Sequence, residues 1–405
     1  MKTTLKYLVA FPLLALFLSA CESFINDVEP LKDYAANDKL NSEEHMDFLI
    51  VGVQSQFADA SSQVAGLSDL LSDQLIFTNM MPLATYPQYA EIEPGQILLD
   101  NNSVAAVFQS VCRLRRVADD LVQRTGDIAF SDTAKRHQAY AVGYLYGGLA
   151  RYYLATSFGI NPTSPGGVID GGPFIAQSDL LDDAVAHFEA AVAHQFSLTE
   201  QRITNSLIAR AYLAKKDYAH AATFAAQGML QGEDPFVCLY NDVSQNFYYT
   251  DAGYGRQQMG VADRFAAYIA ADPAEAVRIP LDSLIGRDGG TYYFQVKYPL
   301  AGSSFPIMTW QENSLMSAEC ALRGSGAGDA LALVNDVRGS HGLSSLSSVD
   351  LAGLMVERDK ELFCQGDRLM DENRGAVPWH LGTGDWHVLP IPRAERDANP
   401  NLPPL

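Results

Sequence analysis

The sequence predicts an all-α protein in which antiparallel helix pairs form a scaffold that carries long irregular loops. Apolar residues recur every three or four positions through most of the chain, which is the spacing of one helix face. Two distant segments also place small residues at the same spacing, as a repeated helix pair would. With 48% hydrophobic and 19% charged residues, the composition is that of a globular protein.

Helical periodicity delimits the first part of the scaffold. It predicts helices over Glu43–Ala58, Ser103–Arg124 and Ala134–Ala155. In the third of these, Gly143 and Gly147 leave one helix face without side chains. Because a glycine pair weakens a helix, we expect these glycines to permit the close approach of a neighbouring helix.

The next helices follow in sequence. Ser178–Phe196 is predicted to be a helix because Ser178 is a good N-cap and several aspartates follow it in the first turn. The segments Thr204–Lys215 and Tyr218–Leu230 are then predicted to form an antiparallel pair, since the polar Lys-Asp dipeptide between them provides a turn.

An internal repeat links two of the helix pairs. Ala209 and Ala221 are twelve residues apart, which resembles the spacing of small residues in a tetratricopeptide hairpin. In the segment Ser314–Gly339, Ala318 and Ala330 have the same spacing across a glycine-rich turn. Small residues at these points allow two helices to cross closely, so we predict two tetratricopeptide-like pairs.

Three aromatic-rich segments between the helices lack helical periodicity: Tyr86–Gln96, Asn246–Gly255 and Thr291–Trp310. We interpret them as loop excursions, and long ordered loops often carry function. Because aromatic faces can stack on flat amphipathic ligands such as sugars, the candidate ligand-binding residues are Tyr86, Tyr89, Tyr248, Tyr249, Tyr254 and Trp310. The alternative is that these rings fill the space between the loops and the scaffold.

The N-terminus has the pattern of a bacterial lipoprotein signal. Lys2 and Lys6 precede the apolar run Leu8–Ala20, which is too short to cross roughly 30 Å of hydrocarbon as a helix. Its end, Leu-Ser-Ala followed by Cys21, resembles the lipobox at which a peptidase cuts before the lipid-bearing cysteine. The alternative is an ordinary signal peptide with an unrelated cysteine nearby.

These boundaries divide the chain into three parts. Residues 1–20 are predicted to be the cleaved signal peptide, residues 21–42 a flexible leader and residues 43–405 a single helical domain. Acyl chains on Cys21 would hold the mature protein at a membrane, because more than one chain makes such an anchor durable.

Charge and motif content argue against several classes of function. The formal net charge of −20 repels phosphate backbones, so we expect no nucleic-acid partner. The four cysteines after Cys21 lack the spacing of a zinc site. His380, Asp385 and His387 cluster in the sequence, but the chain has no GxSxG nucleophile motif. We therefore expect no catalytic residues, no metal site and no cofactor.

Several C-terminal motifs resemble those of one family. Asn335–Leu343 is similar to an N-x-V-R…G-L run, Val356–Asp371 to an E-R-x-x-E-L…G-x-R-x-x-D helix, and Leu389–Leu402 to a P-I-P…N-P-N-L ending. Upstream, Arg151–Pro162 is similar to R-A-x-x-Y…F-G-x-x-P. These motifs resemble those of SusD/RagB-like proteins and extend from about residue 45 to the end. Gln365 departs from the pattern, where the family has an acid.

This resemblance implies a SusD-like fold and a non-catalytic lipoprotein in the outer membrane that faces the cell exterior. The implied partners are a TonB-dependent, SusC-like β-barrel transporter, a glycan or peptide ligand, and outer-membrane lipid through acylated Cys21. A periplasm-facing helical-repeat lipoprotein that scaffolds protein assembly is the alternative, and a hydrolase is a third hypothesis.

Four charged residues lie in the helix that carries this resemblance: Glu357, Arg358, Glu361 and Arg368. Opposite charges three or four residues apart can pair across helix turns. We interpret these residues as a structural ion network and not as a catalytic group.

Overall fold

The computed structural model describes residues 40–403. The predicted signal peptide, Cys21 and nearly all of the predicted leader therefore lie outside the described residues. The chain separates into two units, Met1–Met46 and Asp47–Leu405. The described part of the first unit includes a short 3-10 helix, η2 (Glu43–His45).

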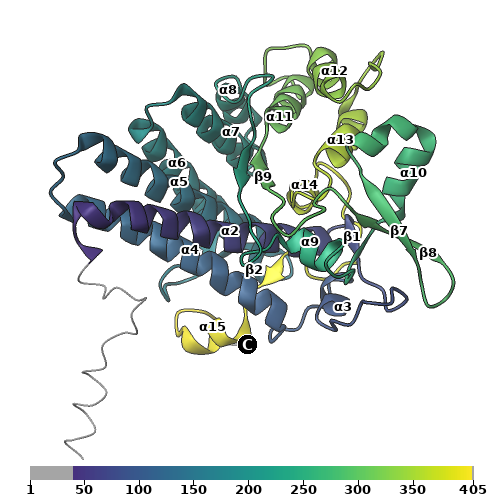
Figure 1. Cartoon of the computed structure of the whole chain (residues 1–405), viewed down its shortest axis with the longest axis horizontal. Coiled ribbons are helices and arrows are strands. Elements are labelled where there is room, and N and C mark those ends of the chain that lie inside the picture. The colour runs from purple at the N-terminus through teal and green to yellow at the C-terminus, as the bar shows by residue number, and fades with distance from the viewer. Residues whose placement is uncertain (1–39, 404–405) are drawn as a thin grey trace, which may run out of the picture. The chain divides into compact units, whose positions relative to one another are not determined.

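Helices form most of the second unit, as the sequence predicts (Figure 1). The longer ones are α2 (Met46–Leu71), α4 (Asn102–Asp127), α5 (Thr133–Ser157), α6 (Gln177–His194), α7 (Leu198–Ala214), α8 (Tyr218–Ala225), α11 (Trp310–Leu322), α12 (Ala330–Ser340) and α13 (Leu351–Glu361). Shorter helices lie between and after them: α3 (Tyr89–Ile92), α9 (Phe247–Ala252), α10 (Asp263–Ala271), η3 (Pro273–Val277), α14 (Arg368–Asn373) and α15 (Arg393–Ala398).

Short strands connect the helices in four small sheets. They are β1 (Leu75–Ile76) with β6 (Gly260–Val261); β10 (Leu389–Pro390), β2 (Phe158–Asn161), β3 (Ser164–Gly167) and β4 (Ile175–Ala176); β5 (Phe236–Cys238) with β9 (Phe305–Met308); and β7 (Leu281–Ile285) with β8 (Thr291–Gln295). In the second sheet, β10 pairs in parallel with β2. Two of the segments that carry the family resemblance are thus neighbours in one sheet.

The first scaffold helix is much longer than the sequence predicts. α2 continues from Ala58 to Leu71, and residues 64–71 are all buried. A helix that is buried on every side has no polar face, so it shows no amphipathic periodicity. The predicted N-cap of α6 is also wrong: Ala176 holds that position, without a side-chain hydrogen bond.

Glycines in α5 allow it to pack closely between α4 and α6. A Cβ atom on Gly143 would lie 2.6 Å from Val122 Cγ2 of α4, and one on Gly148 would lie 2.6 Å from Phe188 Cε1 of α6. On Gly147 it would lie 3.2 Å from His187 Cδ2. Close packing at the predicted glycines is therefore confirmed.

The repeated helix pairs are present in the structure. α7 packs against α8, α11 packs against α12, and α8 contacts α11. Ala209, Ala221 and Ala318 are fully buried and Ala330 is 8% exposed. The small residues of the repeat are therefore buried in the helices that form each pair.

The segments predicted to be irregular contain short regular elements. α3 and α9 lie in the first two segments, and β8 and β9 lie in the third. β8 forms a hairpin with β7, whose turn includes Gly289 in the left-handed conformation that favours glycine (φ +80°). Within residues 40–403, no helix is both long and apolar enough to cross a bilayer.

Two glycine substitutions should have opposite effects on stability. Gly143→Ala gains helix propensity, but overpacking against Val122 outweighs that gain, so we expect a net loss of about 1 kcal/mol in the free energy of unfolding. Gly52 is a control within α2, because nothing lies within 4 Å of a Cβ at that position. Gly52→Ala should stabilise by about 1 kcal/mol. Urea unfolding measures both, and a stabilised Gly143→Ala variant would contradict the packing argument.

Candidate ligand-binding site

A short strand pair brings two of the aromatic segments together. β1 and β6 are antiparallel, with Leu75 opposite Val261 and Ile76 opposite Gly260. Because the strands are antiparallel, the chain that leaves β1 runs beside the chain that enters β6. Figure 1 shows α3, α9 and the β7–β8 hairpin on this side of the second unit, away from α5 and α6.

Gln258 fixes the loop that follows β1. Its buried side-chain oxygen accepts hydrogen bonds from the backbone N–H groups of Thr85 (2.8 Å) and Tyr86 (3.1 Å). Its amide nitrogen donates to the carbonyl of Leu83. One amide side chain thus satisfies three backbone groups of the loop, which positions Tyr86.

Arg256 is an exposed side chain that forms hydrogen bonds with the same loop. Its guanidinium donates to the Tyr86 hydroxyl (2.9 Å) and to Thr85 Oγ1 (2.8 Å). The guanidinium carbon also lies 4.6 Å from the centroid of the Tyr86 ring, which is a cation–π distance. We call Tyr86, Tyr89 and Arg256, together with Tyr254 two residues before Arg256 in the chain, the tyrosine–arginine cluster.

Tyr89 is the buried member of this cluster. It is only 4% exposed, and its ring meets Tyr86 edge-on with the ring centroids 5.5 Å apart. Its hydroxyl donates to Asp251 Oδ1 at 3.3 Å. Burial, together with the nearby Asp251 carboxylate, raises the pKa of Tyr89 far above its usual value. Tyr89 therefore positions Tyr86 and offers little surface of its own.

Tyr254 is the most accessible of the predicted aromatic residues, with 48% exposure. Its hydroxyl donates to Asp282 Oδ2 at 2.9 Å, and its ring meets Phe294 edge-on at 5.6 Å between centroids. Tyr86 and Tyr249 are half-buried. These three rings keep surface that a ligand can reach.

Tyr248 and Trp310 lie in the core, at 0% and 6% exposure. The Tyr248 hydroxyl donates to Asp69 Oδ2 at 2.6 Å, and its ring packs against Tyr298 and Phe305. Both rings therefore lie in the interior of the structure and present little or no surface to a ligand. The alternative interpretation, in which aromatic rings fill the interior, holds for these two positions.

The β7–β8 hairpin supports the loop from the other side. The backbone N–H of Arg287 donates to the carbonyl of Met80, and its guanidinium donates to the carbonyls of Asn79 and Pro82, each at 2.8 Å. No sequence motif marks Arg256, Gln258 and Arg287, because their partners lie 170 or more positions away in the chain. The only sequence signal was their place within or beside aromatic segments.

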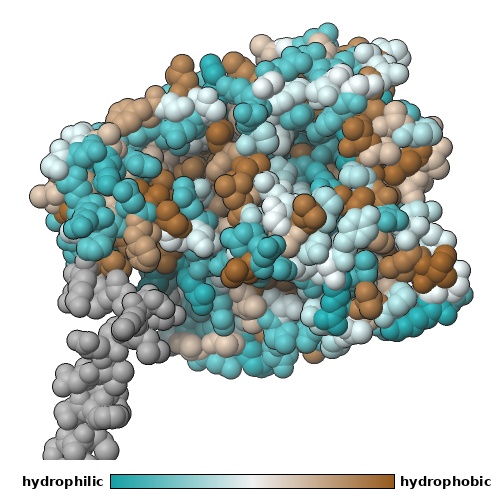
Figure 2. Space-filling view, viewed as in Figure 1, coloured by the Kyte–Doolittle hydropathy of each residue, from teal (hydrophilic) through white to brown (hydrophobic). Residues whose placement is uncertain are grey.

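Hydrophobic side chains are exposed around these loops. Met80 is 40% exposed, Leu83 46% and Ile285 65%. The face drawn in Figure 2 mixes such hydrophobic residues with hydrophilic ones. A separate cavity of about 610 Å³ is lined by residues of α2, α5, α6 and α7 and the segments beside them, but none of the predicted aromatic residues lines it.

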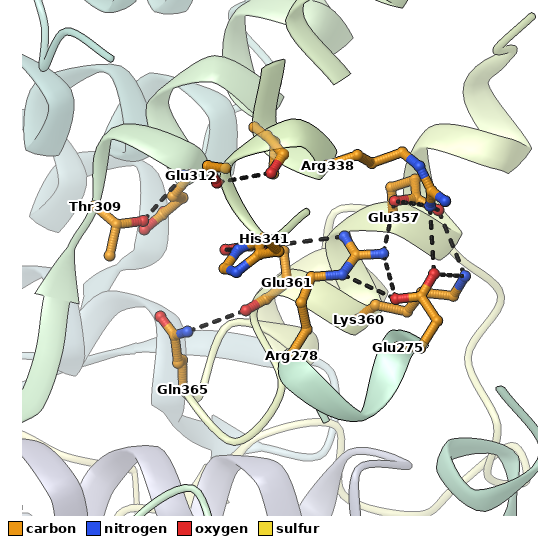
Figure 3. A network of polar contacts seen from close by, with 12 residues as sticks. Glu275, Arg278, Thr309, Glu312, Arg338, His341, Glu357, Lys360, Glu361 and Gln365 are labelled. Atoms are coloured by element: carbon orange, nitrogen blue, oxygen red, sulfur yellow. Dashed lines mark hydrogen bonds and ion pairs between the residues drawn. The ribbon is translucent and has the colours of Figure 1, made fainter. Parts of the chain in front are cut away.

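A buried ion network holds the chain that leads into the hairpin (Figure 3). Glu275 in η3 contacts Arg278 (2.6 Å), Arg338 of α12 (3.3 Å) and Lys360 of α13 (2.9 Å). Glu357 of α13 contacts Arg278 and Arg338, each at 2.9 Å. Burial alone would raise the pKa of Glu275, but hydrogen bonds from Lys360 and Arg278 outweigh it and the pKa lies below its usual value.

The other predicted network residues are also in ion pairs, mostly with partners on other elements. Arg358 contacts Asp371 (3.1 Å), Glu361 contacts His341 (3.0 Å), and Arg368 contacts Asp73 (2.8 Å). Pairs between residues of the same helix therefore contribute less to the ion network than the spacing of these residues suggests. The network joins α13 to α12, α14, η3 and the end of α2.

The three polar residues that cluster near the C-terminus have separate partners. His380 Nδ1 lies 3.2 Å from a Glu372 oxygen, Asp385 accepts from Gln96, and the His387 ring stacks on Trp379 with centroids 4.2 Å apart. No group of three or more His, Cys, Asp or Glu side chains arranged to hold a metal ion occurs among residues 40–403.

The scaffold and the cluster define a helical-repeat protein whose surface loops present aromatic rings beside an arginine. No protein-family model and no curated protein matches the sequence. Solved structures do match. A SusD superfamily protein from Bacteroides thetaiotaomicron VPI-5482 has 16% identity and a TM-score of 0.74, over 89% of this chain and 99% of that chain.

Two further neighbours are glycan-binding proteins. A laminarin-binding SusD-like protein has 15% identity and a TM-score of 0.66, over 89% of this chain and 98% of that chain. Surface glycan-binding protein A from Bacteroides thetaiotaomicron, in complex with laminarihexaose, has 15% identity and a TM-score of 0.63 over the same shares. The chain therefore has the SusD-like fold, which confirms the fold predicted from its C-terminal motifs.

Asp69 should make folding stability depend on pH. Burial raises its pKa to about 8, although the Tyr248 hydroxyl donates to it, and its Oδ1 has no hydrogen-bond partner among the described residues. A raised folded-state pKa contributes stability that is complete below about pH 4 and declines as pH rises towards about pH 8. Asp69→Asn should remove this decline in the free energy of unfolding, which is on the order of a few kcal/mol. Urea unfolding between pH 5 and pH 8 measures it.

Asp73 is the matched control, because its pKa moves in the opposite direction. Burial acts to raise it, but the hydrogen bond from Arg368 and the charge of Arg264 outweigh burial and lower the pKa. Its stabilising contribution is present at neutral pH and is lost on acidification, so Asp73→Asn should destabilise at pH 7. An Asp69→Asn variant with the wild-type pH profile would contradict the assignment.

Proposed function

We propose that the protein is a non-catalytic subunit that binds oligosaccharides at the cell surface for import. The observation that carries this proposal is a set of accessible tyrosines, Tyr86 and Tyr254, that hydrogen bonds and ring contacts fix in place. Rings that are already ordered lose little entropy when a ligand stacks on them. The ligands of two SusD-like neighbours, laminarin and laminarihexaose, support a glycan as the ligand class.

The proposed setting is the outer leaflet of the outer membrane. Acylation of Cys21 would anchor the protein there, and residues 21–42 would connect the anchor to the single helical domain. A TonB-dependent, SusC-like β-barrel would be the transport partner. This part of the proposal rests on the lipobox-like sequence before Cys21 and on the SusD-like fold.

The tyrosine assignment predicts that two substitutions weaken binding. Tyr254→Ala and Tyr86→Ala should each reduce affinity for a bound oligosaccharide by about fivefold, because an aromatic stack contributes about 1 kcal/mol. Isothermal titration with laminarihexaose and a panel of other oligosaccharides measures the loss. Tyr140→Ala, in α5, is the control, and circular dichroism should show unchanged helix content. Wild-type affinity in both cluster variants would show that the ligand binds elsewhere.

The anchor and partner are tested in cells. Cys21→Ser should move the protein from the membrane fraction to the soluble fraction, since the acyl chains can no longer attach. Wild-type protein should be cleaved by protease added to intact cells and should co-purify with a β-barrel after mild solubilisation. Protection from protease, together with purification as a monomer, would favour the alternative of a periplasmic scaffold.

A further inference from the structure

Around the tyrosine–arginine cluster, the arginines and the nearby carboxylates do not form ion pairs with each other. Arg256 and Arg287 are exposed, and within residues 40–403 neither guanidinium has a carboxylate oxygen within 4 Å. Arg256 donates to hydroxyl groups and Arg287 donates to backbone carbonyls. Both cations therefore keep their full charge on the surface of a chain whose formal net charge is −20.

The carboxylates near these arginines bind neutral donors instead. Asp251 accepts from the hydroxyls of Tyr89 and Thr250, and Asp282 accepts from the hydroxyl of Tyr254. Asp288, next to Arg287, accepts from the Tyr292 hydroxyl and a backbone N–H. These nearby carboxylates therefore accept hydrogen bonds from neutral donors and not from the arginines.

Asp251 is the carboxylate whose pKa Arg256 affects. Burial has the largest effect and raises that pKa above the usual value, although hydrogen bonds from Thr250 and Tyr89 and the charge of Arg256 act to lower it. The two carboxylate oxygens of Asp251 accept from hydroxyl groups and not from Arg256. A ligand anion would meet a cation that the protein has not neutralised.

Arg256 is also held in a defined position. A guanidinium has five N–H donors, and the hydroxyls of Tyr86 and Thr85 take one hydrogen bond each. The Tyr86 ring covers one side of the group. The remaining N–H groups belong to an exposed, oriented side chain, and an arginine held in this way binds a planar carboxylate with little loss of entropy.

We propose that the cluster selects oligosaccharides that carry carboxylate groups, such as oligomers of a uronic acid. Arg256 would bind the carboxylate, the accessible faces of Tyr86 and Tyr254 would contact the sugar rings, and Arg287 would attract a second acidic unit. This inference rests on the proposed function. It assigns the class of sugar and not only the presence of a sugar site.

The test compares an acidic oligosaccharide with its neutral counterpart. The probes are a hexamer of galacturonic acid, its methyl ester and laminarihexaose, titrated into the full mature protein by calorimetry at low and high salt. The acid should bind at least tenfold more tightly than the ester. Arg256→Gln should weaken binding of the acid by about tenfold to a hundredfold more than it weakens binding of the ester, as expected for a hydrogen bond to a charged group that only the acid can form.

Two further variants separate charge from architecture. Arg113→Gln removes the same charge from an exposed position in α4 and should leave all affinities unchanged. Arg256→Lys should keep part of the preference for the acid, because it retains the charge and loses the planar fork. Equal loss of acid and ester binding in Arg256→Gln would show that Arg256 only braces the loop, which would overturn the inference.

The outcomes also distinguish this inference from the function on which it rests. If the protein binds laminarihexaose or the ester as tightly as the acid, glycan binding stands and selection of acidic sugars is wrong. If it binds none of the three oligosaccharides, both the proposed function and the inference fail.

Discussion

The site depends on the buried ion network around Glu275 and Glu357. An unpaired charge in the interior would cost several kcal/mol, so these carboxylates are tolerated because Arg278, Arg338 and Lys360 surround them. The network ties η3 to α12 and α13, and the chain passes directly from η3 into β7. It therefore sets where the hairpin begins, and with it the position from which Arg287 supports the loop after β1.

Beyond the start of the hairpin, polar contacts order the surface loops without covering them. Gln258 is fully buried and satisfies backbone groups of the loop, while Arg256 and Tyr254 remain exposed. Buried donors and acceptors must be paired, so each loop has few alternative conformations that satisfy the same groups. Gln258 therefore holds the loop from beneath, while exposed hydrogen bonds from Arg256 to Tyr86 and from Tyr254 to Asp282 hold the rings at the surface.

The sequence predicted the scaffold better than the site, for physical reasons. α5, α6 and the two alanine-spaced pairs have local signals, since their packing faces recur with the helical period. The second half of α2 has none, because it is buried on all sides. Aromatic composition located the loops that carry the tyrosine–arginine cluster but could not tell that Tyr248 points inward to Asp69. Arg256 and Gln258 were missed because their partners are brought near only by the pairing of β1 with β6.

The difference between the scaffold and its surface loops also explains how the fold persists at low sequence identity. A neighbour with 16% identity superposes with a TM-score of 0.74, which shows that few identical residues are needed for these helices to pack in this order. Packing requires small residues where helices cross and compensated charges where polar groups are buried, and many sequences meet both conditions. The exposed tips of the loops carry no such constraint. Tyr86, Tyr254 and Arg256 are therefore positions where the surface can change chemistry while the scaffold that presents it stays the same.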